Sequence, residues 1–154
     1  MNEEYYAGID PSLTATGLVM INNEGEIVVE KLIKTERDVY LCSEQRILDI
    51  MEDIIFLKNV RYLQRVFVED LSYMSQSTSL FERCGLLYLI STFLFKNDID
   101  YKKIPPKSLK KWAVGNGNAD KKMMMEKSEI RWGIKFTDDN ICDAYNLSQM
   151  AHKD

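Results

Sequence analysis

Acidic side chains stand at the ends of two apolar runs that lie far apart in the sequence. Asp10 closes the run YYAGI, and Glu69 closes the run RVFV. Taken alone, Asp10 would be explained by turn chemistry, since Asp before Pro commonly opens a turn. Two acidic strand ends on adjacent strands, however, would repel each other unless a cation lay between them. The pair therefore predicts a divalent metal site beyond the strand ends of an α/β sheet, where ligands tend to bind.

The C-terminal segment TDDNICDAYNLSQMA offers further oxygen ligands. Helical spacing places four residues on one stripe: Asn140, Asp143, Leu147 and Met150. Burying Asp143 on this stripe without compensation would cost roughly several kcal/mol. Asp139 lies one turn before Asp143 and could share its direction, whereas Asp138 is expected only to start the helix. Oxygen ligands from separated segments, without His or Cys, suit Mg²⁺ or Mn²⁺.

Other catalytic chemistries lack the side chains that they need. The chain has three widely spaced cysteines and one histidine, which are Cys42, Cys84, Cys142 and His152. This pattern argues against a zinc site or a Cys–His nucleophile, and the thiols are expected to be reduced and mostly buried. A two-ion acidic site suits phosphodiester hydrolysis, in which one ion activates water and the other stabilises the leaving oxygen.

The net charge of -4 hides a strong asymmetry along the chain. Residues 1–100 carry 9 basic and 17 acidic side chains, whereas residues 101–135 carry 10 basic and 3 acidic ones. A basic block inside an acidic chain indicates a local binding site for a polyanion. A solvated lysine-rich face is the alternative reading.

The pattern of apolar residues predicts an alternation of strands and helices. Strands are expected at 5–9, 16–22, 26–33, 65–69 and 101–104, and helices at 41–59, 77–95, 107–113, 119–131 and from about 138 onward. The first three strands follow one another closely, which predicts an antiparallel meander. The whole order predicts an α/β fold, with a mixed sheet and helices on its faces.

Composition predicts one domain over residues 1–154, with 45% hydrophobic residues and no low-complexity segment. No apolar stretch reaches the roughly 18 residues of a membrane span. The opening MNEEYY is unlike the basic start of a signal peptide. We therefore expect a soluble, cytoplasmic protein (in the cytoplasm of a host cell, if the source is viral) with no membrane partner.

At this point the sequence resembles a known family. AGIDPSLTATGLVMI is similar to the opening strand and turn of RuvC-type Holliday junction resolvases, which belong to the RNase H-like nuclease superfamily. Four further stretches agree in order: VFVED, SLFERCG, IPPKSLKKWAVGNGNADKK and CDAYNLS. The short length and the divergence from bacterial members suggest a phage or other viral source.

The resemblance implies an RNase H-like mixed five-stranded sheet flanked by helices, in a homodimer that nicks four-way DNA junctions symmetrically. By position, Asp10 and Glu69 match the first two catalytic, metal-binding carboxylates, and Asp143 matches the last acid of a D-x-x-D-A pattern. Two Mg²⁺ or Mn²⁺ ions per site are implied. Helicase partners are not indicated.

Asn140 stands where that pattern has its remaining acid. A neutral carbonyl ligand should lower the affinity for metal. Either Asp139 substitutes for the missing acid, or the site is impaired by nature, or Asn140 was introduced to inactivate the enzyme. We favour the last, since Asp to Asn keeps the shape of the side chain while removing its charge.

The resemblance also implies a DNA-binding surface. Lys110 and Lys121 correspond to two basic positions of the family, and Lys107, Lys111 and Lys122 could extend them. Ser72 stands where familiar bacterial members carry a Phe that stacks on a junction base. Tyr73 could stack instead, with a contribution on the order of 1–3 kcal/mol, or it could serve ordinary loop packing. The altered loop leads us to expect relaxed sequence preference at the cut site.

Three functions remain open on these grounds. The leading one is a Mg²⁺-dependent junction resolvase. Another RNase H-like nuclease, acting on hybrids or flaps, is the nearest enzymatic alternative. A non-cleaving junction-binding protein of the same fold is the third, and Asn140 is the residue that favours it.

Overall fold

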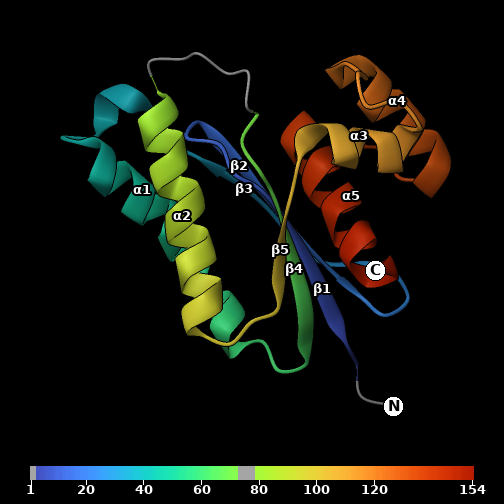
Figure 1. The fold of residues 1–154 in the computed structure, drawn as a ribbon, viewed down its shortest axis with the longest axis horizontal. Helices are drawn as coiled ribbons and strands as arrows, with labels where there is room; N and C mark the ends of the chain where they lie inside the picture. The colour runs from blue at the N-terminus through green and yellow to red at the C-terminus, as the bar shows by residue number, and fades with distance from the viewer. Residues whose placement is uncertain (1–2, 73–78) are drawn as a thin grey trace.

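The computed structural model describes residues 3–72 and 79–154, which form one mixed sheet between two layers of helices (Figure 1). The strands are β1 (Tyr5–Asp10), β2 (Ala15–Asn22), β3 (Ile27–Lys34), β4 (Leu63–Glu69) and β5 (Tyr101–Ile104). Their order across the sheet is β3-β2-β1-β4-β5. β1 is antiparallel to β2 and parallel to β4, so the meander and the parallel half meet at this strand. The predicted mixed five-stranded sheet, an antiparallel meander plus parallel strands, is confirmed.

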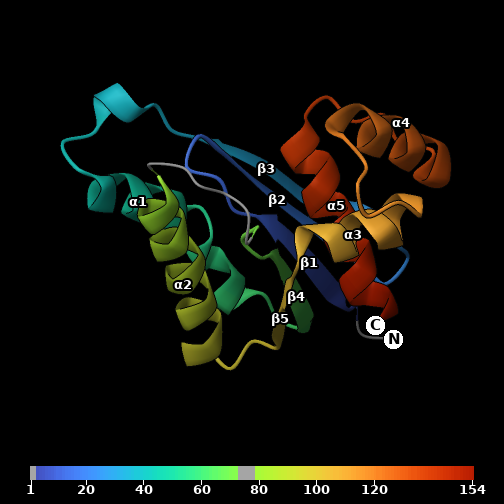
Figure 2. The same ribbon diagram turned by 45° about the horizontal axis from the view of Figure 1, so that its top comes forward.

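Helices cover both faces of the sheet (Figures 1 and 2), and side chains of the central strands belong to separate core clusters on the two faces. The α-helices are α1 (Ser43–Glu52), α2 (Leu80–Lys96), α3 (Pro106–Val114), α4 (Lys121–Trp132) and α5 (Asp139–Lys153). On one face, Ile9 and Val68 join the cluster under α1 and α2. On the other face, Phe67 packs against Leu147 of α5. Burial on both faces explains why these strands read as continuous apolar runs.

The residues Asn22-Asn23-Glu24-Gly25 predict a turn between the second and third strands, and the structure has it there. Gly25 has a positive φ of 84°, which glycine adopts at little cost. The Asn22 side chain accepts the backbone N–H groups of Glu24 and Glu26. This Asx-type arrangement sets the register of β2 against β3.

The helix predicted at 41–59 is shorter than expected. α1 ends at Glu52, and a 3-10 helix follows at Ile55–Asn59. Asp53, at the C-terminal end of α1, pairs with Lys31 of β3 at 3.0 Å, and the tighter turn beyond it carries Leu57 into the core. The helical spacing of Ile47, Leu48 and Met51 predicts that they share an apolar face, but Leu48 is exposed.

The helical spacing of Leu80, Phe81, Cys84, Leu87 and Tyr88 predicts one apolar face for α2, and this prediction is only partly right. The side chains that pack on the sheet are Leu86, Leu87, Ile90 and Leu94. Phe81 and Tyr88, which the helical spacing groups with Leu87, are exposed to 88% and 63%. Because α2 is apolar nearly all round, the sequence does not decide which of its sides faces the sheet.

Within the described ranges, no helix is both long enough and apolar enough to cross a membrane.

Candidate active site

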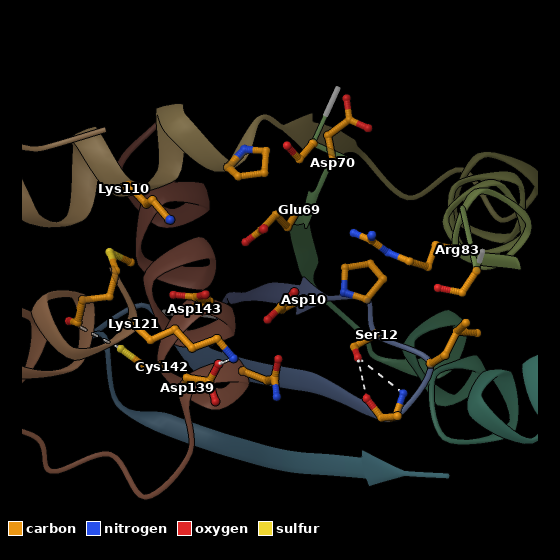
Figure 3. A pocket seen from close by; sticks show the side chains of 18 of the residues that line it. Asp10, Ser12, Glu69, Asp70, Arg83, Lys110, Lys121, Asp139, Cys142 and Asp143 are labelled. Carbon is orange, nitrogen blue, oxygen red and sulfur yellow. Dashed lines mark hydrogen bonds and ion pairs between the residues drawn. The ribbon is translucent and has the colours of Figure 1, made fainter. Parts of the chain in front are cut away.

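Three carboxylates from separate elements converge at the carboxyl ends of β1 and β4. Asp10 is the last residue of β1, and Glu69 is the last residue of the parallel strand β4. Asp143 comes from the second turn of α5, which packs on β1. One oxygen from each carboxylate lies within 4.8 Å of the other two. Figure 3 shows the three side chains directed into the same space.

Two glycines allow the backbone of α5 to lie directly on the sheet. A Cβ atom on Gly8 would stand 2.0 Å from the carbonyl oxygen of Ala144, and one on Gly17 would stand 2.3 Å from that of Asn140. Asp138 caps the helix, because its carboxylate accepts the backbone N–H of Asn140 at 2.8 Å. The predicted role of Asp138 as a helix-start residue is confirmed. This close packing brings Asp143 to the strand ends.

The environment of the cluster disfavours its ionised form. Burial, followed by the charges of Glu69 and Asp143, raises the pKa of Asp10 well above its ordinary value. Burial and the Asp143 charge raise the pKa of Glu69 from 4.5 to about 8. Burial and the Asp139 charge raise the pKa of Asp143 from 3.8 to about 7. Three acids held this closely need a compensating cation to ionise together at neutral pH.

The donor set fits a hard divalent cation. Oδ1 of Asp143 is buried and has no hydrogen-bond partner among the described residues. Such an atom carries a desolvation cost that a bound ion would remove. The cluster supplies only oxygen ligands, which suits Mg²⁺ or Mn²⁺ rather than zinc. Asn140 is partly buried and lines the same cavity one turn before Asp143, where its carbonyl could add a neutral ligand.

Asp139 has a different partner. Its Oδ2 lies 2.6 Å from Nζ of Lys121, and it stands outside the group of three carboxylates. Asp139 nevertheless lines the same cavity as Asp143, one turn away, and its charge is the second cause of the raised pKa of Asp143, so its role as a substitute ligand stays a prediction. The ion pair raises the pKa of Lys121, through the hydrogen bond to Asp139 first and its charge second. Figure 3 shows this contact at the edge of the cluster.

A cavity of about 720 Å³ surrounds the carboxylates, and part of the basic block lines it. Lys107, Lys110 and Lys121 contribute to its wall. Lys111 and Lys122 are exposed but do not line it, and Lys122 lies 3.8 Å from Glu126. The predicted basic surface thus divides into three lysines at the cavity and two beyond it. Tyr73 lies outside the described residues.

Arg131 and two tryptophan rings hold together α3 and α4, the helices that carry the three cavity lysines. The guanidinium of Arg131 on α4 lies 4.4 Å from the ring centroid of Trp112 on α3 and 4.6 Å from that of Trp132. Its Nη1 also donates to the carbonyl oxygens of Trp112 and Ala113, at 2.6 and 2.9 Å. Arg131 therefore satisfies the last carbonyls of α3 and fixes α4 against it. Gly115, whose φ is 77°, caps the C-terminal end of α3 before the chain continues to α4.

Sequence reasoning missed the basic side chains on the opposite wall. Arg37, Arg46 and Arg83 all line the cavity, and none belongs to the basic block. Arg83 lies close enough to Glu69 for its charge, like that of Lys110, to lower the pKa of that acid against the larger effect of burial. The signal available was the stretch SLFERCG, which contains Arg83 and was matched without a role.

The sheet order and helical layers, with acids at the ends of β1 and β4, define an RNase H-like nuclease fold. Within that class, the chain belongs to the RuvC family. Residues 6–149 match the sequence model of this family, which is described as "Crossover junction endodeoxyribonuclease RuvC".

Individual relatives agree with this assignment. The chain is 26% identical over 148 residues to the crossover junction endodeoxyribonuclease RuvC of Brachyspira hyodysenteriae, covering 94% of this chain and 91% of that protein. It is 29% identical over 134 residues to the protein of the same name from Orientia tsutsugamushi, covering 83% of this chain and 81% of that protein. A Thermus thermophilus RuvC structure superposes with a TM-score of 0.76 at 20% identity, over 94% of this chain and 90% of that one. The T. thermophilus RuvC complex with a Holliday junction substrate gives 0.75 at 19% identity, over the same shares.

Proposed function

We propose that this chain is a divalent-metal-dependent endonuclease that resolves four-way DNA junctions by paired, symmetric nicks. The observation that carries the proposal is the cluster of Asp10, Glu69 and Asp143 in a cavity walled by lysines. Membership of the RuvC family supports a branched DNA substrate, because the relatives are named crossover junction endodeoxyribonucleases and T. thermophilus RuvC was solved with a Holliday junction substrate. We take residues 1–154 as a single nuclease domain.

In this proposal the three carboxylates and the Asn140 carbonyl hold Mg²⁺ or Mn²⁺, two ions per site. A bound ion supplies Lewis-acid activation of water and offsets negative charge at the reacting phosphate. The charges of the acids would otherwise repel a DNA strand, so holding cations is also a condition for substrate approach. The residues act as a fixed scaffold, since two of them close strands of one sheet and the third lies on a helix packed against it.

Lys107, Lys110 and Lys121 bind backbone phosphates beside the acids. Such contacts add affinity without reading bases, which suits an enzyme that recognises the shape of a junction. We assign Lys111 and Lys122 to the outer part of the same DNA surface. Ser72, in place of the family's stacking Phe, supports relaxed sequence preference at the cut, with Tyr73 as the candidate replacement.

Paired nicks require two active sites, and we propose that a homodimer supplies them. Phe81, Tyr88 and Phe95 recur every seven residues along α2, and their exposed fractions are 88%, 63% and 74%. An exposed aromatic stripe of this kind marks an interaction surface. We expect sedimentation equilibrium to show a dimer, and Phe81→Glu to shift it toward the monomer. A monomeric parent protein would rule out paired nicking by a stable dimer.

The deciding experiment is a cleavage assay with Mg²⁺ or Mn²⁺ on a synthetic four-way junction, an RNA–DNA hybrid and a flap. The parent chain, Asp10→Asn and Asn140→Asp are compared. We expect junction-selective cutting that Asp10→Asn abolishes and Asn140→Asp increases. Preferred cutting of the hybrid or the flap would point to another RNase H-like nuclease.

One observation favours a second candidate, a junction-binding protein that does not cut. Asn140 removes a charged ligand from the position where the family has an acid. Junction binding that persists in Mg²⁺ without product, even after Asn140→Asp, would establish this alternative. A gain of cleavage in that variant would exclude it.

A further inference from the structure

The acidic cluster lies between two basic walls that come from opposite sides of the sheet. Lys110 and Lys121 belong to α3 and α4, on the α5 side, whereas Arg83 belongs to α2 on the other side. Figure 3 shows the carboxylates of Glu69 and Asp10 between the lysines and Arg83, whose guanidinium is directed toward them. A strand laid over the acids would therefore meet cations from both helical layers.

The second wall continues away from the acids into a side arm. A smaller cavity of about 170 Å³ shares Arg37, Arg46 and Glu82 with the main cavity. These residues come from the 3-10 helix Arg37–Val39 and from α1 and α2, so three elements meet there. We call Arg37, Arg46 and Arg83 the arginine wall. The smaller cavity is lined by two arginines, Arg37 and Arg46, and by one carboxylate, that of Glu82, whose Oε1 accepts a hydrogen bond from the Ser43 hydroxyl; Arg83 lines the main cavity.

Arg46 is the unusual member of the arginine wall, because it is charged and only 7% exposed. Its Nε donates to the Thr35 hydroxyl at 2.7 Å, and its Nη2 donates to the Thr35 carbonyl at 3.2 Å. Both partners are neutral, and no carboxylate of the described residues lies within ion-pair distance of Arg46. Burying a cation without an opposite charge is costly. An anion in the side arm would offset that cost.

The same arginine also supports the loop that follows Asp10. The Thr35 hydroxyl, which accepts from Arg46, donates in turn to the Leu13 carbonyl oxygen. The Thr35 backbone N–H donates to the Thr14 carbonyl oxygen at 3.1 Å. Leu13 and Thr14 line the main cavity. Arg46 is thus tied to the floor of the site, and an anion that it binds would lie at a fixed distance from the acids.

We propose that the arginine wall is a second phosphate-binding subsite, which holds the DNA strand on the side of the acidic cluster opposite to Lys107, Lys110 and Lys121. The inference rests on the proposed function and names a part of its substrate contact. Guanidinium groups suit this role, since their planar fork binds phosphate oxygens in pairs. A strand anchored on both sides of the acids has its reacting phosphate held in place, whereas a strand anchored on one side could swing away from them.

The first test measures junction binding against salt. A labelled four-way junction is titrated in CaCl₂ between 50 and 300 mM NaCl, with the parent protein, Arg37→Gln, Arg83→Gln and Arg83→Lys. Each Gln variant should lower the slope of log K against log salt by about 0.7–0.9 and weaken binding about five-fold at 0.1 M salt. Arg83→Lys should keep the slope. Lys58→Gln is the control, because it removes one exposed charge that does not line either cavity.

The second test asks where the arginine wall touches the strand. Single phosphates near the branch point are replaced by neutral methylphosphonates, and binding is compared in the parent protein, Arg83→Gln and Lys110→Gln. Neutralising a phosphate that Arg83 contacts should weaken junction binding by the parent protein and by Lys110→Gln, but it should not change binding by Arg83→Gln. We expect the phosphates assigned to Arg83 and those assigned to Lys110 to form two separate sets.

The outcomes separate the inference from the proposed function. If Lys110→Gln reduces the salt slope but both arginine-to-glutamine variants leave it unchanged, the arginine wall does not bind DNA. If Arg83 and Lys110 share the same phosphates, the two walls are not opposite sides of one strand. In both cases the proposed junction binding stands while the inference fails. A parent protein that binds no junction overturns both. Arg46 is left unchanged because its contacts with Thr35 support the fold.

Discussion

Replacing Asp143 by Asn should make the metal-free protein more stable at pH 8. The pKa of Asp143 rises from 3.8 to about 7 in the folded chain, chiefly through burial and then through the charge of Asp139. A difference of about three pH units corresponds to about 4 kcal/mol between the two protonation states. Water that enters the open cavity and relaxation of the side chains lower this figure, so we expect a gain of about 2 kcal/mol.

The sign follows from proton linkage. The folded protein holds protons on Asp143 and Glu69 at pH values where the unfolded chain has lost them. Stability therefore falls as the pH rises, from about 4, where the unfolded acids ionise, to about 8, where Glu69 ionises in the folded chain. Asp143→Asn removes one of these groups. Its advantage should vanish at pH 4 and reach its full size at pH 8.

Divalent metal should reverse the order of stability, so that the parent protein becomes more stable than Asp143→Asn. An ion that binds the folded state stabilises it by mass action, and the variant lacks one of the three carboxylates that we propose as its ligands. We expect urea denaturation in EDTA at pH 8 to favour Asp143→Asn, and the same measurement in 10 mM MgCl₂ to favour the parent. Glu30→Gln, an exposed change on β3, serves as the control and should behave like the parent in both buffers. A variant that is less stable than the parent in EDTA at pH 8 would show that burial and the neighbouring charges do not disfavour the ionised form of Asp143.

Four further outcomes are expected. Asp10→Asn should reduce metal-dependent cleavage more than about 100-fold, because it removes a ligand at the centre of the cluster, and Asn140→Asp should raise the affinity for Mg²⁺ measured by calorimetry. Lys110→Gln should weaken junction binding about five-fold at 0.1 M salt and lower the salt slope by about one, whereas a change confined to cleavage would assign it to the reaction instead of to binding. Gly8→Ala should cost about 3 kcal/mol or more in thermal unfolding, since its Cβ would stand 2.0 Å from a backbone oxygen of α5; a cost below about 1 kcal/mol would contradict the close packing.

The parts of the site carried by β1, β4 and α5 were predictable because each residue ends or interrupts a regular pattern. Asp10 and Glu69 close apolar runs, and the parallel pairing of the two strands brings their ends together. Asp143 interrupts an apolar helical stripe. In these cases periodicity alone decides which way the side chain points, so spacing in the sequence translates into a position in space.

The sequence did not predict features that depend on which side of a helix faces the sheet. α2 is apolar nearly all round, and its spacing did not show that Leu87 would be buried while Tyr88 would be exposed. Arg46 and Arg83 are isolated basic residues in the acidic part of the chain, so charge counting passed over them. Their shared place in the cavity arises only when α1 and α2 pack side by side on the sheet.

The difference between Asp139 and Asn140 has the same origin and bears on the charge of the site. Successive helical residues point about 100° apart, so Asp139 and Asn140 cannot both face the acids squarely. Asp139 pairs with Lys121 at 2.6 Å within the wall of the cavity, and three carboxylates other than Asp139 make up the group of closely spaced acids. To replace the missing acid, Asp139 would have to leave Lys121 and add a fourth negative charge to a site where burial already raises the pKa of Glu69 to about 8. The Lys121 contact opposes that exchange, and for this reason the neutral Asn140 carbonyl is the better candidate to complete the ligand set.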